Sequence, residues 1–210
     1  MPPQARGARP AVGFPRRGQA RGDPAPGSRG VTPLDRFIQR LRIRKALPHI
    51  PAGGRLLDIG CADGTLIRAA GGRVRDAVGI DPDAPAGPGL VRGSFPQDLG
   101  DKGPYDVIAL LAVFEHVHDE DRPAFVAACR ALLRRGGRVV VTVPAPLVDR
   151  IVDVLRRLHL IDGMDIEAHH GYQPEQTPMY FADAGMRLVT HERFELGLNH
   201  LFVFELPGSL

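Results

Sequence analysis

The stretch LLDIGCADG, residues 56–64, decides the fold class of this chain. It begins as an apolar segment of the length of a buried strand, interrupted only by Asp58, and it ends in a turn built from small residues. Gly60 and Gly64 stand four positions apart in that turn, and a helical pattern follows over residues 65–70. A strand that passes through a glycine turn into a helix is the opening unit of an α/β fold.

Strand and helix patterns alternate along the chain on both sides of this stretch. Strands are predicted at 55–60, 76–81, 90–95, 105–114 and 138–144, and helices at 32–47, 65–70, 122–134, 147–160 and 173–184. Strands that alternate with helices form a mostly parallel sheet covered by helices. The sequence therefore predicts an α/β fold with a Rossmann-like, doubly wound sheet.

The last two predicted strands, at 186–196 and 200–206, run in opposite directions. Only residues 197–199 join them, whereas a crossover between parallel strands needs a dozen residues or more. The predicted sheet is thus mostly parallel, with an antiparallel strand at its C-terminal end.

Basic residues are concentrated before the predicted sheet begins. Residues 1–47 contain 11 of the 27 Lys and Arg residues and 2 of the 24 Asp and Glu residues, which leaves 16 basic and 22 acidic residues in the remainder. Residues 1–32 are rich in Arg, Pro and Gly without an apolar period, so we predict a disordered head and a single folded domain over 33–210. The alternatives for this head are a tether for nucleic acid or anionic lipid and an organelle presequence. Its many Pro and Gly residues disfavour the amphipathic helix of a presequence.

The sequence shows neither the apolar core of a secretory signal nor a membrane span. The longest apolar run, residues 107–114, is far shorter than the roughly 20 residues that cross a bilayer. The two cysteines, Cys61 and Cys129, lack the spacing of a zinc site and the number of a disulfide framework. These features predict a cytoplasmic protein without stable membrane insertion. The excess of Arg over Lys is typical of a GC-rich bacterial genome.

Candidate ligand-binding residues stand at the ends of the first two predicted strands, because open α/β sheets bind ligands at the carboxyl edge. Asp58 precedes the glycine turn, where it can meet a cationic or hydroxylated group. The small residues from Gly60 to Gly64 let backbone N–H groups approach a ligand beside a helix N-terminus. Asp81 follows Gly60 by 21 residues, in position to accept hydrogen bonds from two ribose hydroxyls. Each residue alone could serve a turn or a helix cap; their common position at one sheet edge favours a ligand site.

The glycine spacing separates two classes of nucleotide site. Sites for nicotinamide or flavin dinucleotides prefer G-x-G-x-x-G, whose glycines accommodate a pyrophosphate. Here the spacing is G-x-x-x-G with Ala62 at the middle position, and no G-K-[ST] phosphate loop is present. The spacing disfavours an NAD-dependent oxidoreductase and favours a nucleoside ligand without a pyrophosphate.

Four motifs resemble, in order, those of class I S-adenosylmethionine-dependent methyltransferases of the small bacterial type (methyltransferase-11/23-like). They are LLDIGCADG (56–64), GIDPD (79–83), YDVIALLAVFEHVHD (105–119) and ALLRRGGRVVVTVP (131–144). The resemblance runs from about Arg55 to the end of the chain. It implies an enzyme, a seven-stranded sheet with an antiparallel seventh strand, and S-adenosylmethionine as methyl donor, with S-adenosylhomocysteine as product.

The resemblance also implies a role for each matching residue. Asp58, Gly60, Cys61 and Gly64 would lie against the methionine moiety, Asp81 would bind the ribose, Ser94 and Phe95 would flank the adenine, and Val113, Phe114 and Glu115 would line the sulfonium side. The family often has an acidic residue where Ser94 stands, and Asp98 is the candidate substitute.

An oxygen acceptor needs a base besides alignment with the methyl group. The candidates are His116, in a Glu-His pair after the strand at 105–114, and His170 and Tyr172, in the segment 161–176, where the family places substrate-binding elements. Some relatives bind a divalent metal through E-x-x-E-H. Ala112 occupies the first position of that pattern, so no metal is expected.

The expected reaction is O- or N-methylation of a small-molecule, glycan or lipid-linked acceptor. RFELGLNHLFVFE (193–205) resembles the C-terminal strand pair of bacterial methyltransferases often linked to glycan or lipid modification. An RNA or protein methyltransferase and a non-catalytic S-adenosylmethionine-binding module are the alternatives. The acidic body and the lack of an aromatic-rich surface disfavour nucleic acid as a partner, and the sequence leaves the oligomeric state open.

Overall fold

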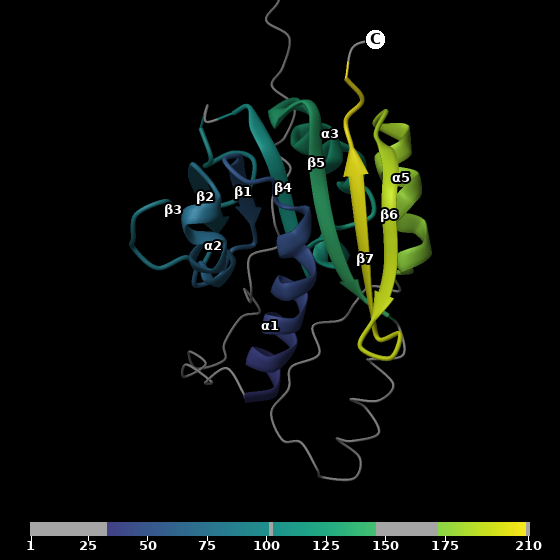
Figure 1. The fold of residues 1–210 in the computed structure, drawn as a ribbon. Helices are drawn as coiled ribbons and strands as arrows, with labels where there is room; N and C mark the ends of the chain where they lie inside the picture. The colour runs from purple at the N-terminus through teal and green to yellow at the C-terminus, as the bar shows by residue number, and fades with distance from the viewer. Residues whose placement is uncertain (1–32, 101–102, 146–171, 209–210) are drawn as a thin grey trace, which may run out of the picture.

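The computed structural model describes residues 33–100, 103–145 and 172–208 of the 210-residue chain. Seven strands form one sheet in the order β3-β2-β1-β4-β5-β7-β6 (Figure 1). The strands are β1 Arg55–Ile59, β2 Asp76–Asp81, β3 Leu90–Arg92, β4 Tyr105–Leu111, β5 Leu133–Pro144, β6 Arg187–Phe194 and β7 Asn199–Glu205. The α-helices are α1 Pro33–Ala46, α2 Thr65–Ala70, α3 Arg122–Leu132 and α5 Thr177–Asp183, with 3₁₀ turns at Leu47–His49, Gly71–Arg73, Phe114–His116 and Pro174–Gln176.

Strands β1 to β5 are parallel to one another, and β7 lies antiparallel between β5 and β6. The short link between β6 and β7 produces this arrangement, because it lets the chain reverse but not cross over the sheet. The predicted Rossmann-like, seven-stranded, mostly parallel fold is confirmed.

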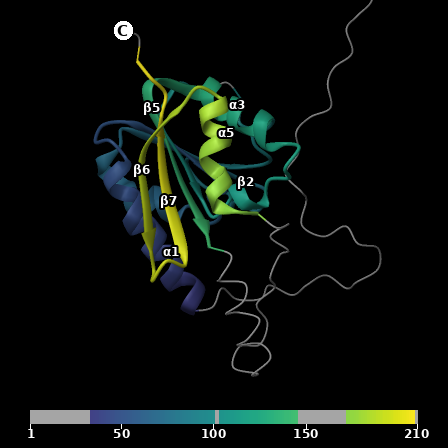
Figure 2. The same ribbon diagram turned by 90° about the vertical axis from the view of Figure 1, so that its right-hand side faces the viewer.

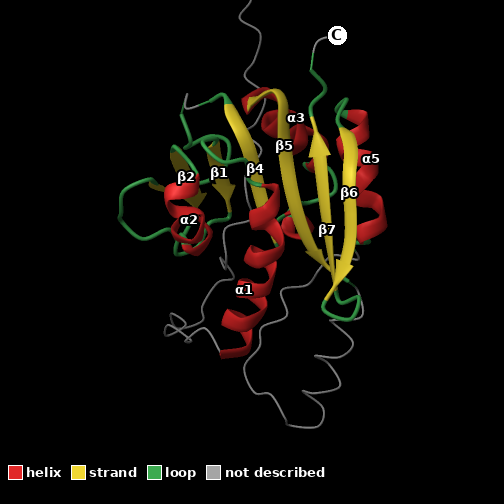
Figure 3. Cartoon of the chain, viewed as in Figure 1, coloured by secondary structure: helices red, strands yellow, loops and turns green. Residues whose placement is uncertain are grey.

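The described helices cover both faces of the sheet (Figures 2 and 3). Helices α1 and α2 share one core with Leu56, whereas α3 and α5 share the other core with Leu57. Successive side chains of a strand point to opposite faces. Asp58 has the parity of Leu56 and therefore lies on the face that α1 and α2 cover.

Strand β4 ends at Leu111, three residues before the predicted end at 114. Ala112 has a left-handed φ of 58°, which takes the chain out of the sheet, and Phe114–His116 then forms a 3₁₀ turn. The continuous apolar run gave no sign of this turn, because few residues other than glycine adopt a positive φ.

Strand β5 begins at Leu133 and not at 138, so α3 ends two residues earlier than predicted. Leu133 already pairs with Tyr105, and a register shift accommodates Gly136, whose φ is 73°. Pairing with β4 thus overrides the helical pattern that continues to residue 134. Strand β3 is also shorter than predicted, because the Asp98 carboxylate accepts the N–H of Ser94 and turns the chain.

The helix predicted at 173–184 is confirmed as Pro174–Gln176 followed by α5. The head 1–32, the helix predicted at 147–160 and residues 161–171 of the predicted substrate-side segment lie outside the described residues. Among the helices that are described, none has the length and apolar character needed to cross a membrane.

Candidate functional site

The carboxyl end of β1 lies between the carboxyl ends of β2 and β4. Ile59 pairs with Ile80 of β2 and with Leu110 of β4, so the residues that follow, Gly60 and Asp81, are neighbours. The chain order reverses at β1, and open α/β sheets bind ligands at such a switch point. The structure therefore brings the predicted residues of the first two strands together at one edge.

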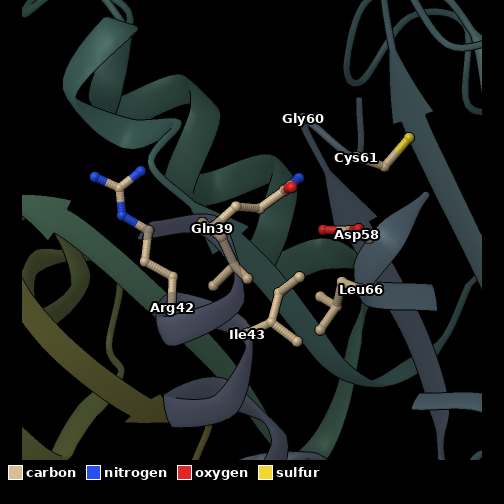
Figure 4. Close-up of a pocket in the computed structure, with 8 residues that line it drawn as sticks. Gln39, Arg42, Ile43, Asp58, Gly60, Cys61 and Leu66 are labelled. Atoms are coloured by element: carbon tan, nitrogen blue, oxygen red, sulfur yellow. The ribbon is translucent and has the colours of Figure 1, made fainter. Parts of the chain in front are cut away.

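A cleft with an empty volume of about 350 Å³, part of it open to solvent, lies between α1 and this end of β1 (Figure 4). The Asp58 carboxylate and the Gln39 amide point toward one another across it, and the Cys61 sulfur is turned away. The cleft is lined by Gln39, Arg42, Ile43, Asp58, Gly60, Cys61, Leu66 and Leu111.

Asp58 is a buried carboxylate without a hydrogen-bond partner among the described residues. Its side chain is 3% exposed. Burial, followed by the negative charges of Asp81 and Asp63, raises the pKa of Asp58 from 3.8 to about 8. A buried charge is costly unless an opposite charge accompanies it. The site is therefore suited to a ligand that brings a cation, such as an ammonium group, to this carboxylate.

Gly60 permits a close approach between the turn after β1 and the loop after β4. Its φ is 74°, and a Cβ at this position would lie 2.3 Å from Cγ2 of Val113. No other residue type fits both the backbone conformation and this contact. Val113, one of the three predicted sulfonium-side residues, is thus packed directly against the turn.

The N–H groups of the glycine turn are already bonded within the protein, in contrast to the expectation that they would face a ligand. Those of Gly60 and Cys61 donate to the Ile80 carbonyl at 2.8 and 3.3 Å. That of Gly64 donates to the Cys61 carbonyl at 2.8 Å, and that of Ala62 donates to the Asp81 carboxylate at 3.0 Å. The turn therefore lets a ligand approach the backbone closely, but it offers few free N–H donors.

Asp81 is held in place by two backbone groups. One carboxylate oxygen accepts the N–H of Ala62, and the other accepts that of Asp83 at 2.8 Å. A carboxylate offers about four acceptor positions, so two positions stay available for hydroxyl donors. This geometry suits the predicted contact with two ribose hydroxyls.

The two predicted adenine-side residues lie in different environments. Ser94 is half-buried just beyond β3, and its N–H donates to Asp98 at 2.7 Å. Phe95 is buried in the core, where its ring meets that of Phe125 edge-on at 5.1 Å between centroids. Asp98, the candidate substitute for an adenine contact, therefore also stabilises the turn itself.

The other two predicted sulfonium-side residues, Phe114 and Glu115, belong to the protein interior. Phe114 is fully buried in a group of aromatic rings that includes Tyr172 and Tyr180, and Glu115 is 1% exposed. The Arg122 guanidinium lies in the same group, 4.5 Å from the centroid of the Tyr172 ring.

The three catalytic candidates have different settings. His116 ends the 3₁₀ turn after β4 and is half-buried. Tyr172 is 7% exposed, its hydroxyl is hydrogen-bonded to that of Thr177, and burial raises its pKa. A raised pKa makes this phenol a poor base near neutral pH. His170 lies outside the described residues. The described side chains include no group of three or more His, Cys, Asp or Glu that could hold a metal.

The sequence reading missed Gln39 and Arg42, which line the cleft from α1. Arg42 donates from Nε to the Asn199 side chain at 3.2 Å, which ties α1 to the start of β7. The sequence does hold a signal for them, because Gln39 and Arg42 are polar residues on the buried face of an amphipathic helix, next to Ile43. Such positions are expected to be apolar unless a ligand or partner needs them.

Residues 32–191 match the family described as methyltransferase domain. Among curated proteins, ubiquinone biosynthesis O-methyltransferases of Acinetobacter baylyi and Acinetobacter baumannii are 25% and 26% identical over 156 residues. The match covers 65% of this chain and 65% of each relative, so the chain spans about two thirds of their length.

Solved structures with a similar fold include a SAM-dependent methyltransferase from Archaeoglobus fulgidus, with a TM-score of 0.61 and 15% identity over 81% of this chain and 94% of that one. The N-methyltransferase NodS from Bradyrhizobium japonicum has a TM-score of 0.56 and 15% identity over 84% of this chain and 98% of NodS. NodS in complex with S-adenosylhomocysteine has a TM-score of 0.57, with 14% identity over 84% of this chain and 89% of NodS. At this level of identity the likeness establishes the fold.

Proposed function

Because the chain belongs to the methyltransferase domain family and is an S-adenosylmethionine-dependent methyltransferase, we propose that it methylates an oxygen or nitrogen of a small-molecule, glycan or lipid-linked acceptor. The donor site in this proposal is the cleft between α1 and β1. The observation that carries it is the Asp58 carboxylate, which is buried without a hydrogen-bond partner among the described residues and faces that cleft.

The residues of the cleft fit the amino-acid part of the donor. Asp58 would accept the ammonium group, and the donors of Gln39 and Arg42 would bind the carboxylate. Asp81 would accept the ribose hydroxyls, beside the close contact of Gly60 and Val113. When bound, S-adenosylmethionine supplies a methyl group already activated by a sulfonium. The task of these side chains is to orient the donor and to exclude water.

The remaining predicted contacts belong to the same proposal. Ser94 and Phe95 would border the adenine, with Phe95 fixed in the core as a rigid wall. Cys61 and Gly64 would shape the turn, and Glu115 and Phe114 would support the loop that carries Val113 from behind. No metal takes part in this scheme.

The acceptor class is supported by two observations. The curated relatives are named as O-methyltransferases of ubiquinone biosynthesis, and the chain beyond residue 47 carries 16 basic and 22 acidic residues, a balance that repels nucleic acid. His116, on the loop after β4, is the proposed general base for an oxygen acceptor, and His170 is the second candidate. We place the reaction in the bacterial cytoplasm.

Calorimetry with two ligands tests the donor site. S-adenosylhomocysteine has both an amino-acid part and a nucleoside, whereas 5′-methylthioadenosine lacks the amino-acid part. Arg42→Met should weaken the binding of S-adenosylhomocysteine by about tenfold, the loss of one charge-assisted hydrogen bond, and should leave the binding of 5′-methylthioadenosine unchanged. Asp81→Ala should weaken both ligands, and Asp83→Ala is the matched control. Equal effects of Arg42→Met on the two ligands would show that the amino-acid part binds elsewhere.

A further inference from the structure

The solvent-facing side of α1 is a cationic stripe that the donor site does not use. Arg36, Arg40 and Arg44 recur every four residues, with Phe37 beside them, and all four side chains are exposed. At 3.6 residues per turn they span an arc of about 100°. The neighbouring side of the helix, which carries Ile43 and Ala46, is buried in the core. We call the four exposed residues the α1 basic stripe.

The charges of the α1 basic stripe are not neutralised by the folded body. Two other basic residues of the helix are engaged: Lys45 pairs with Glu192 at 2.9 Å, and Arg42 bonds to Asn199. The three arginines of the stripe make no ion pair or hydrogen bond with the residues that the structure describes. Residues 1–32, directly before the helix, add six arginines and one aspartate to this end of the chain.

Exposed apolar side chains accompany the charges. Phe37 is 58% exposed within the stripe, and Leu196, at the turn between β6 and β7, is fully exposed. Figures 1 and 2 both show this turn at the same end of the sheet as the N-terminal half of α1, the end where the parallel strands have their carboxyl ends. Arginines flanked by exposed apolar side chains match the interfacial region of a bilayer, where charge meets lipid headgroups and apolar side chains reach the acyl chains.

We propose that the α1 basic stripe docks this protein on an anionic lipid surface. Nucleic acid would also attract the arginines, but a single-strand site needs several exposed rings on which bases stack. Phe37 is the one aromatic side chain among the large exposed apolar residues of the described ranges. Leu196 is aliphatic and suits insertion among acyl chains. Docking itself needs no methyl transfer; the further implication, that a lipid-linked acceptor reaches the cleft beneath α1 from that surface, rests on the proposed function.

Vesicle flotation of the full chain tests this proposal. Binding is expected to vesicles of phosphatidylcholine with phosphatidylglycerol, to fall as salt rises, and to be absent with phosphatidylcholine alone. Each arginine near an anionic surface contributes about a fivefold factor at low ionic strength. The variant R36Q/R40Q/R44Q should therefore bind about 100-fold more weakly, and Phe37→Ser should also weaken binding.

The control is R130Q/R135Q/R187Q, which removes three exposed arginines from α3, β5 and β6, including one, Arg187, that pairs with Glu205 at 3.0 Å. It should bind vesicles as the unaltered protein does, and all variants should keep their melting temperature and their affinity for S-adenosylhomocysteine. An equal loss in both triple variants, or no binding of the unaltered protein to anionic vesicles, overturns the proposal. Tighter binding to a single-stranded RNA oligonucleotide than to vesicles at the same salt also overturns it and assigns the stripe to nucleic acid.

Discussion

Replacing Asp58 by asparagine should stabilise the free protein while weakening ligand binding. The carboxylate is 3% exposed, and burial together with Asp81 and Asp63 raises its pKa from 3.8 to about 8. Between these two values the folded protein holds a proton that the unfolded chain has released. The stability of the unaltered protein therefore falls as pH rises through this window.

The size of the effect follows from the ionised fraction. With a pKa of about 8, Asp58 is about 1% ionised at pH 6 and about half ionised at pH 8. If the bound ammonium requires the ionised form, S-adenosylhomocysteine binds about 50-fold more tightly at pH 8 than at pH 6. The same proton balance lowers the free energy of unfolding of the free protein by about 2 kcal/mol over this interval.

Titration calorimetry between pH 6 and pH 8 measures both quantities when it is run in two buffers of different ionisation enthalpy. Binding to the unaltered protein should release about one proton at pH 6 and about half a proton at pH 8. The Asp58→Asn variant should release none, should show no pH slope, and should gain about 2 kcal/mol of stability over the unaltered protein between pH 6 and pH 8.

Asp106 supplies the matched control, because it is a buried aspartate with partners. Its carboxylate accepts the N–H of Arg55 at 2.7 Å and pairs with Arg75 and Arg134. Asp106→Asn should therefore lower the stability and leave the affinity and its pH slope unchanged. A flat affinity of the unaltered protein between pH 6 and pH 8, or a slope that persists in Asp58→Asn, would refute the reasoning.

Three further predictions concern the loops around the cleft. Gly60→Ala places a Cβ 2.3 Å from Val113 at a φ of 74°, so melting should show a loss of about 2 kcal/mol in stability and calorimetry should show weaker ligand binding. Adding Val113→Ala should restore part of the stability and part of the affinity. If the effects of the two substitutions simply add, this contact is not the cause. His116→Asn should lower methyl transfer to an oxygen acceptor by about 100-fold without changing S-adenosylhomocysteine affinity, whereas an equal loss in the control His118→Asn would point to a general disturbance of the loop. Tyr172→Phe leaves a buried hydroxyl unpaired, so it should cost about 1 kcal/mol of stability and retain methyl transfer; loss of transfer at unchanged stability would identify Tyr172 as catalytic.

Local patterns were sufficient for the order and type of most elements. The alternation of apolar segments predicted five parallel strands, and the short link at 197–199 predicted the antiparallel pair. These features depend on residues that are close together in the chain, so they can be predicted from the sequence. The errors came where a distant segment changed the local preference, as when pairing with Tyr105 drew Leu133 into β5.

The sequence by itself determined the fold class and the family of this protein: alternating strands and helices predicted the mostly parallel sheet, and four ordered motifs resembled those of the methyltransferase family that the chain matches. Only the tertiary structure decided how the carboxyl edge of the sheet is completed. It brought Gln39 and Arg42 of α1 to the cleft that Asp58 faces, and it bonded the N–H groups of the turn to Ile80 and Asp81. The physical reason is that hydrogen-bond partners, burial and a raised pKa depend on which segments pack together across the fold. The spacing of residues along one segment does not indicate these contacts.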